Sequence, residues 1–143
     1  MEFSIVVPIK NEVNYIPRTL PSYYNLKPSE VVLCFDDPPD AEALAVTRKV
    51  VEACGAEDIS KFIFVKRDSK WAYHQANVRR SGFRVAKYDG ILTTDIDILI
   101  NKNALKTLEL IGKDNVGLCS CSKFYYPIGL SGLMRAMERN VFR

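Results

Sequence analysis

The sequence has a single histidine and four cysteines, and no two of the cysteines lie at CxxC spacing. A structural zinc site needs four Cys or His ligands at short, regular spacings. The sequence therefore excludes a zinc-binding domain. Three of the cysteines fall in apolar runs, where free cysteine acts as a small hydrophobic residue in a reducing compartment. The four are Cys34, Cys54, Cys119 and Cys121.

No apolar run reaches the roughly 18 to 20 residues that a membrane-spanning helix needs, and no signal peptide precedes the first apolar segment. Glycosylation acceptors of the form Asn-x-Ser/Thr are also absent. The net charge of +3 is small, and basic and acidic residues are interspersed along most of the chain, so the composition indicates no nucleic-acid partner. We expect a cytoplasmic protein, or one that is peripheral at the inner membrane surface.

The 143 residues are 48% apolar, enough for one globular core, and apolar runs alternate with helix-like stretches. Asp40 precedes the second helical stretch and Gly55 follows it, as is usual for a helix N-cap and C-cap. The alternation predicts an α/β protein with a doubly wound, mostly parallel sheet. The expected strands are Phe3–Ile9, Glu30–Phe35, Phe62–Lys66, Ile91–Ile100 and Val116–Ser122, and the expected helices are Asn11–Leu26, Ala41–Cys54, Gln75–Lys87 and Asn103–Ile111.

The expected strand Ile91–Ile100 contains two carboxylates, Asp95 and Asp97, in an otherwise apolar and β-branched run. Residues i and i+2 of an extended chain project to the same face, so both side chains would point at one spot near the strand's carboxyl end. Two like charges this close repel each other, and Mg²⁺ or Mn²⁺ relieves the repulsion. The alternative is a strand that ends in a polar turn, with Asp97 capping the next segment.

Polar residues also follow the other expected strands, and ligands of doubly wound folds bind at the carboxyl ends of the strands. This clustering predicts a binding site at that edge of the sheet. Lys70, Trp71 and His74 come shortly after the third strand and either belong to an active-site loop or are a packed tryptophan and surface polar residues. The clustered groups are Lys10–Glu12, Asp36–Asp37, Lys66–Asp68 and the pair Asp95 and Asp97.

Three segments carry a resemblance to a known family. Ser4–Glu12 is an apolar strand that ends in Pro-x-x-Asn-Glu, Val31–Asp37 is a strand that ends in paired Asp, and residues 95–97 form Asp-x-Asp. In this order and spacing they resemble the N-terminal, nucleotide-sugar-binding region of family 2 glycosyltransferases. The resemblance covers about Ser4 to Ile100 and implies the GT-A fold, a Rossmann-like nucleotide-binding fold.

The resemblance also implies a function and a set of site residues. The function is a metal-dependent glycosyltransferase of the hexosyltransferase type, which uses Mn²⁺ or Mg²⁺ and moves a sugar from a UDP- or GDP-sugar to a lipid phosphate or glycan acceptor. A lipid phosphate is already an anion near neutral pH and would need no general base. The residues implied in donor binding are Pro8, Lys10, Glu12, Asp36, Asp37, Arg79 and Asp95, and those implied in metal binding are Asp95 and Asp97.

Individual roles follow from the same resemblance. Asp36 or Asp37 would bond the edge of the uracil or guanine ring. Val78–Gly82 resembles the family's Ala-Arg-Asn-x-Gly, with Arg79 as a diphosphate or ribose contact or, alternatively, part of a solvated helix face. Glu12 either lines the pocket or favours the positive end of the next helix. The residues that would line the base and ribose pocket are Pro8, Lys10 and Glu12.

The sequence also departs from the family. The loop after the second strand reads Asp-Asp-Pro-Pro-Asp in place of Asp-Asp-Gly-Ser-x-Asp, and Arg80 replaces an Asn. Few acids follow the Asp-x-Asp motif, so the general base is unassigned; they are Glu109, Asp114 and Glu138. A non-catalytic nucleotide-sugar-binding module is therefore an alternative function. A sugar-1-phosphate nucleotidylyltransferase is another, although its Gly-rich, basic signature is missing after the first strand.

Residues 127–143 are predicted to form an amphipathic, basic helix after a nucleotide-sugar-binding domain over residues 1–126. Apolar residues recur there at helical spacing, and arginines take other positions. The helix either packs against the sheet or contacts a membrane surface. The apolar set is Leu130, Leu133, Met134, Met137 and Val141, and the basic set is Arg135, Arg139 and Arg143.

Overall fold

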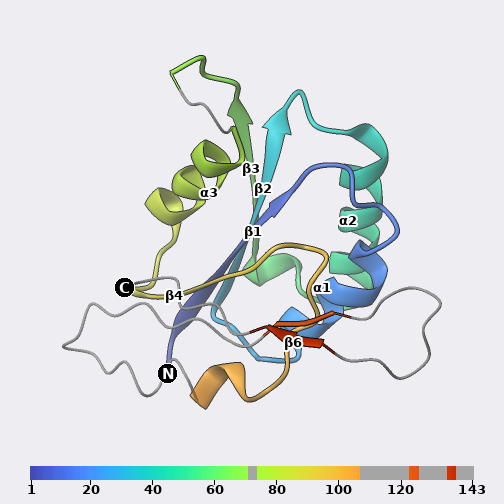
Figure 1. Cartoon of the computed structure of the whole chain (residues 1–143), viewed down its shortest axis with the longest axis vertical. Helices are drawn as coiled ribbons and strands as arrows, with labels where there is room; N and C mark the ends of the chain where they lie inside the picture. The colour runs from blue at the N-terminus through green and yellow to red at the C-terminus, as the bar shows by residue number, and fades with distance from the viewer. Residues whose placement is uncertain (71–73, 107–122, 126–134, 138–143) are drawn as a thin grey trace. The chain divides into compact units, whose positions relative to one another are not determined.

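The computed structural model describes residues 1–70, 74–106, 123–125 and 135–137 of the chain (Figure 1). The chain divides into two compact units, Met1–Ile100 and Asn101–Arg143, whereas the sequence places a boundary between residues 126 and 127. No helix in the described ranges has both the length and the apolar character that crossing a bilayer requires.

The first unit is built on a four-stranded, fully parallel sheet with the strand order β3-β2-β1-β4. Its strands are β1 (Phe3–Ile9), β2 (Glu30–Asp37), β3 (Ser60–Lys66) and β4 (Gly90–Thr93). Val6 at the centre of β1 is level with Val32 on one side and Thr93 on the other. The predicted α/β fold with a doubly wound, mostly parallel sheet is confirmed.

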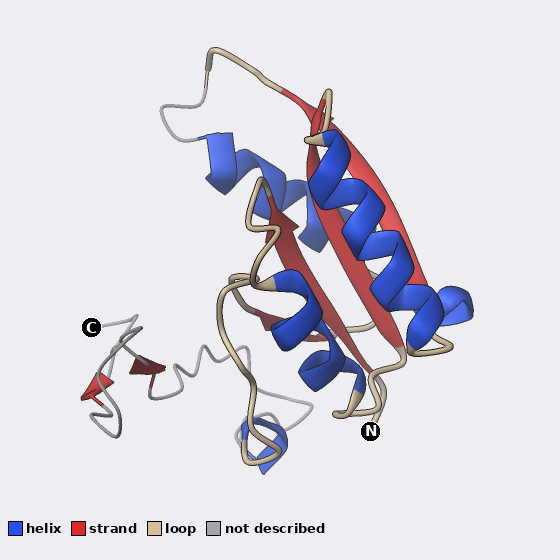
Figure 2. Cartoon of the chain, turned by 90° about the vertical axis from the view of Figure 1, so that its right-hand side faces the viewer, coloured by secondary structure: helices blue, strands red, loops and turns tan. Residues whose placement is uncertain are grey.

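Helices cover both faces of this sheet (Figures 1 and 2). Helices α1 (Ile16–Tyr24) and α2 (Ala41–Ala53) pack against each other on one face, and α3 (His74–Val85) lies on the other against β1 and β2. A short 3-10 helix, η1 (Glu57–Ile59), precedes β3. Because α3 returns the chain across the sheet, β4 pairs with β1, and the strand order reverses between these two strands. In open α/β sheets this reversal is where ligands bind, at the carboxyl ends of the strands.

The core lies between the sheet and its helices, as expected for strands that read as continuous apolar runs. Under α3, a buried cluster joins Val6, Val32, Cys34 and Val78. Burial raises the pKa of the Cys34 thiol to about 12, so this cysteine is a neutral, hydrophobic core residue. Helix α3 comes so close to the sheet at Gly82 that a Cβ there would lie 2.5 Å from Val6 Cγ1 and 2.7 Å from Cys34 Sγ.

The start of α2 was predicted correctly from the sequence, and the start of α1 was not. Helix α2 begins where predicted, because Asp40 Oδ1 accepts a hydrogen bond of 2.8 Å from Ala43 N, and Gly55 follows it with φ at +59°. Helix α1 begins at Ile16, later than the predicted start at Asn11. The residues before it form hydrogen-bonded turns, and Pro17 occupies the first turn of the helix, where its missing N–H is tolerated.

The predicted strand Ile91–Ile100 is wrong in its second half. Strand β4 ends at Thr93, and the acidic pair lies beyond it, in a turn closed by a hydrogen bond of 3.1 Å from Ile98 N to Asp95 O. The argument that both carboxylates project from one face of a strand therefore does not hold. The alternative of a strand that ends in a polar turn describes this segment.

In the second unit, β5 (Lys123–Tyr125) pairs antiparallel with β6 (Arg135–Met137). The helix predicted over residues 127–143 is therefore wrong at Arg135–Met137, because pairing with β5 overrides the helical spacing of its apolar residues. The rest of that segment lies outside the described residues, as do the predicted strand Val116–Ser122 and Cys119 and Cys121. Of the predicted helix Asn103–Ile111, Asn103 lies in a turn, residues 104–106 are helical and residues 107–111 are not described.

Candidate functional site

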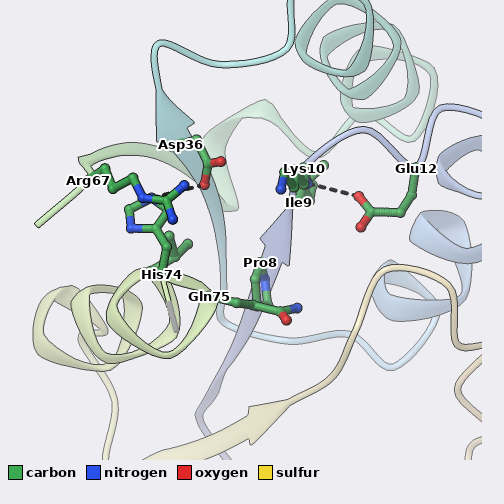
Figure 3. A pocket seen from close by; sticks show the side chains of 9 residues that line it. Pro8, Ile9, Lys10, Glu12, Asp36, Arg67, His74 and Gln75 are labelled. Carbon is green, nitrogen blue, oxygen red and sulfur yellow. Dashed lines mark hydrogen bonds and ion pairs between the residues drawn. The ribbon is translucent and has the colours of Figure 1, made fainter. Parts of the chain in front are cut away.

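A pocket opens at the carboxyl ends of β1 and β2, next to the start of α3 (Figure 3). Its volume, about 150 Å³, is below the ~300 to 1,000 Å³ of pockets that enclose a whole small ligand, so it fits one part of a larger ligand. The residues that line it are Pro8, Ile9, Lys10, Glu12, Asp36, Arg67, His74, Gln75 and Val78.

Asp36 and His74 contact each other in the lining of this pocket. His74 Nε2 lies 3.2 Å from Asp36 Oδ1, and the two side chains are 12% and 33% exposed. Both ring nitrogens of His74 are buried, and neither has an aligned hydrogen-bond partner in the described part of the chain. His74 and Asp36 are therefore in close contact without an aligned hydrogen bond between them. A buried polar atom of this kind normally has a water or ligand partner.

Glu12 holds the loop that leaves β1. Its Oε2 accepts a hydrogen bond of 2.8 Å from Lys10 N, as the dashed line in Figure 3 marks. The side chain therefore fixes the turn at the pocket edge, while α1 begins only at Ile16. Of the two alternatives for Glu12, the structure places it at the pocket, with the backbone of Lys10 as its partner.

The alternating directions of side chains along β2 separate Asp36 from Asp37. Asp36 lines the pocket, whereas Asp37, which precedes a cis peptide bond to Pro38, does not. Successive residues of a strand point to opposite faces of the sheet, which agrees with the different positions of these two carboxylates. Asp36 is therefore the member of the pair that faces the pocket.

Arg79 and Asp95, both expected in donor binding, contact each other. The guanidinium of Arg79, on α3, pairs with Asp95 Oδ1 in the turn after β4, and the side chains are 31% and 37% exposed. A partly exposed pair of this kind contributes only about 0 to 1 kcal/mol to stability. Replacing the contact with Asp95 by a contact between the Arg79 guanidinium and a phosphate group would therefore cost little free energy.

The turn that carries the acidic pair is attached to α1 by hydroxyl groups. Tyr23 Oη lies 2.9 Å from the carbonyl oxygen of Asp95 and 2.7 Å from that of Ile98, and it shares its single hydrogen between them. The Thr19 hydroxyl donates to the carbonyl of Ile96. Burial raises the pKa of Tyr23 well above its usual value, so this hydroxyl stays protonated as a donor.

The acidic turn is suited to a metal ion that is shared with a ligand. Among the residues that the structure describes, no three His, Cys, Asp or Glu side chains gather into a metal site. Mg²⁺ and Mn²⁺ are commonly held by one or two carboxylates, with substrate phosphates filling other positions. Asp97 is exposed and Asp95 is half-buried, so these two carboxylates fit the role of the protein ligands in such a site.

Three residues that line the pocket, Arg67, His74 and Gln75, were not among the donor-binding residues predicted from the sequence. Arg67 belongs to a polar cluster noted at the end of the third strand, which was the available signal for it. His74 is the chain's single histidine, and its place at the start of α3, just after the carboxyl end of β3, could have marked it as a pocket residue rather than a surface one. Nothing in the local sequence distinguishes Gln75.

Comparisons with known proteins agree with this architecture. The family model described as glycosyl transferase family 2 matches residues 4–141. No match was found among curated proteins.

Two solved structures are similar to the chain. One is the crystal structure of S. aureus TarS 1–349, with 26% identity and a TM-score of 0.56, covering 78% of this chain and 32% of TarS. The other is the mannosyltransferase PcManGT from Pyrobaculum calidifontis in complex with GDP-Man and Mn²⁺, with 20% identity and a TM-score of 0.61, covering 81% of this chain and 34% of that one. The chain thus spans about a third of each. Both have the GT-A fold, so the predicted GT-A fold is confirmed.

Proposed function

The chain belongs to glycosyl transferase family 2, and from this membership we propose that it binds a UDP- or GDP-sugar and takes part in transferring the sugar to an acceptor, as a hexosyltransferase. The observation that carries the proposal is the pocket at the carboxyl ends of β1 and β2. Four of the residues implied in donor binding line it together, namely Pro8, Lys10, Glu12 and Asp36.

The pocket is proposed to hold the nucleobase. Asp36 supplies a carboxylate, which accepts hydrogen bonds from the ring N–H groups that uracil and guanine both carry. A carboxylate that accepts such bonds in a partly buried site contributes more than a neutral acceptor does. The pocket volume suits this role, because it holds one part of a nucleotide sugar and leaves the remainder outside.

Three cations are available to the diphosphate. Lys10 and Arg67 line the pocket, and Arg79 lies on the adjacent α3. Charge builds on the diphosphate as the bond to the sugar breaks, and fixed cations near the departing group stabilise that charge. Arg79 suits this task because its planar guanidinium can donate two parallel hydrogen bonds to a phosphate.

Asp95 and Asp97 are the residues proposed to hold a divalent cation together with the diphosphate. When bound, Mn²⁺ or Mg²⁺ would supply Lewis-acid stabilisation of the negative charge on the departing nucleoside diphosphate. The two carboxylates fit a divalent cation, since both lie on one turn after the carboxyl end of β4. The solved mannosyltransferase, which was determined with GDP-Man and Mn²⁺, supports the choice of ion.

The proposed acceptor is a lipid phosphate or a glycan. A phosphate acceptor carries its own negative charge near neutral pH and attacks without a general base. A glycan hydroxyl would instead need a base, and the acids that follow the acidic turn in the sequence, Glu109, Asp114 and Glu138, lie outside the described residues.

Calorimetry and thermal unfolding with UDP, GDP and their sugar conjugates, each with and without Mn²⁺, test the proposal. Nucleotide with Mn²⁺ should stabilise the chain more than either does alone. Relative to the ligand-free chain, the gain should be about 2.7 kcal/mol at a nucleotide concentration a hundred times the dissociation constant. Absence of binding by every nucleotide, with or without Mn²⁺, would overturn the proposed function.

A further inference from the structure

Three hydroxyl-bearing residues of α1 face the acidic turn. Thr19, Ser22 and Tyr23 are spaced i, i+3 and i+4, which places them on one face of the helix. Thr19 donates to the carbonyl of Ile96, Tyr23 to those of Asp95 and Ile98, and Ser22 Oγ accepts a hydrogen bond of 3.2 Å from Ile100 N. All of these hydrogen bonds are to backbone groups, so they fix the backbone conformation of the turn.

The turn depends on these contacts because it has left the sheet. Strand β4 ends at Thr93, and after Thr94 N, which donates to Val6 O at 3.3 Å, no strand supplies partners to the backbone in the described part of the chain. Buried backbone groups without partners are costly. Tyr23 is fully buried and Thr19 is 3% exposed, so water cannot easily replace their hydroxyls.

The side chain of Asp97 is exposed, and within the described residues its carboxylate makes no hydrogen bond and no ion pair. Its direction therefore follows from the backbone of the turn. A site that binds a small cation requires its ligands to be held within about 0.5 Å of the productive geometry.

We infer that Thr19, Ser22 and Tyr23 are positioning residues for Asp95 and Asp97. By fixing the backbone of the turn they set where the two carboxylates lie, and so they determine how much a divalent cation adds to nucleotide affinity. This inference rests on the proposed function. It adds residues from α1, a helix that contributes no side chain to the lining of the base pocket.

The neighbouring residue Tyr24 provides a matched control. Its hydroxyl is hydrogen-bonded at 2.6 Å to Ser60 Oγ, at the start of β3, and burial raises its pKa to about 12. Tyr23→Phe and Tyr24→Phe therefore each remove one hydrogen-bonded hydroxyl from the same helix. Only the first of them releases the acidic turn.

The experiment compares these two variants by amide hydrogen exchange without ligand and by calorimetry of UDP and GDP with and without Mn²⁺. Tyr23→Phe should speed exchange at Ile98 and lower the Mn²⁺-dependent gain in nucleotide affinity about tenfold, which corresponds to about 1.4 kcal/mol. Its nucleotide affinity without metal should match that of the wild type. Tyr24→Phe should leave both readouts unchanged. Should Tyr23→Phe fail to fold, Ser22→Ala removes the partner of Ile100 N and should speed exchange at that amide with the same loss of metal-dependent gain.

The outcomes separate the inference from the proposed function. If the wild type shows no Mn²⁺-dependent gain, the proposed function fails and the inference fails with it. If the wild type shows the gain and both Tyr23→Phe and Ser22→Ala keep it in full, the inference alone is overturned. An equal loss in Tyr23→Phe and Tyr24→Phe would also overturn it, because the effect would then be one of general stability.

Discussion

His74 Nε2 lies 3.2 Å from Asp36 Oδ1, so the single histidine of the chain faces the carboxylate that ends the buried part of β2 (Figure 3). Asp36 lines the pocket at this contact. We therefore expect nucleobase binding to depend most on Asp36.

Asp36→Asn should weaken binding of UDP or GDP both with and without Mn²⁺. The variant keeps the shape of the side chain but loses the charge, and hydrogen bonds to charged groups contribute about 1.5 to 3 kcal/mol, equivalent to roughly tenfold to hundredfold in affinity. Calorimetry measures the loss. Asp89→Asn, at an exposed acid before β4, is the control. A loss at Asp37→Asn equal to that at Asp36→Asn would contradict the assignment.

Asp97→Ala should have a different effect, because it removes a proposed metal ligand and leaves the base pocket intact. Nucleotide affinity without metal should stay at the wild-type value, while the increase on adding Mn²⁺ should disappear. The same calorimetric titrations measure both quantities. If Asp97→Ala retained the full Mn²⁺ effect, this carboxylate would have no part in metal binding.

Gly82→Ala should destabilise the fold, although alanine favours helices by up to about 1 kcal/mol over glycine. The added Cβ would lie 2.5 Å from Val6 Cγ1 and 2.7 Å from Cys34 Sγ, both in the buried core. Overpacking of this kind costs roughly 1 to 3 kcal/mol, so the clash should outweigh the helix preference. Urea unfolding measures the difference, with Ser81→Ala on the same helix as the control. An unchanged or higher midpoint would show that α3 can move away from the sheet.

Stability should fall at alkaline pH, in part through Cys34. Its pKa is raised by burial from 9.0 to about 12 in the folded chain, so between these values the unfolded chain loses the proton and the folded chain keeps it. The contribution is fully present below about pH 9 and is lost as the pH rises toward 12. Urea midpoints measured from pH 8 to 11 should decline less steeply for Cys34→Ala than for the wild type. Equal slopes would mean that the thiol does not ionise on unfolding in this range.

The sheet could be predicted from the sequence because its signals are local. The apolar runs of β1 and β2 mark buried strands, that of β3 marks a further strand, and the alternation with helices indicates parallel pairing. The same holds for α2, whose N-cap Asp40 and following Gly55 lie within a few residues of the ends that they set.

Two predictions based on local patterns were wrong because partners outside the segment decided its structure. The apolar spacing of residues 127–143 favoured a helix, yet Arg135–Met137 pair with β5. The β-branched run Ile91–Ile100 favoured a strand throughout, yet its second half forms hydrogen bonds with the hydroxyls of α1.

By itself, the sequence determined the first three strands, the parallel sheet and the edge at which its polar residues gather, because hydrophobic periodicity and capping act over a few neighbouring residues. Only the tertiary structure decided which of those polar residues meet. It turned Asp36 rather than Asp37 to the pocket and brought His74 beside it. It also joined Arg79 to Asp95 and tied the acidic turn to Tyr23. These contacts link residues far apart in the sequence, and their geometry depends on how helices pack across the sheet, which no local window of residues contains.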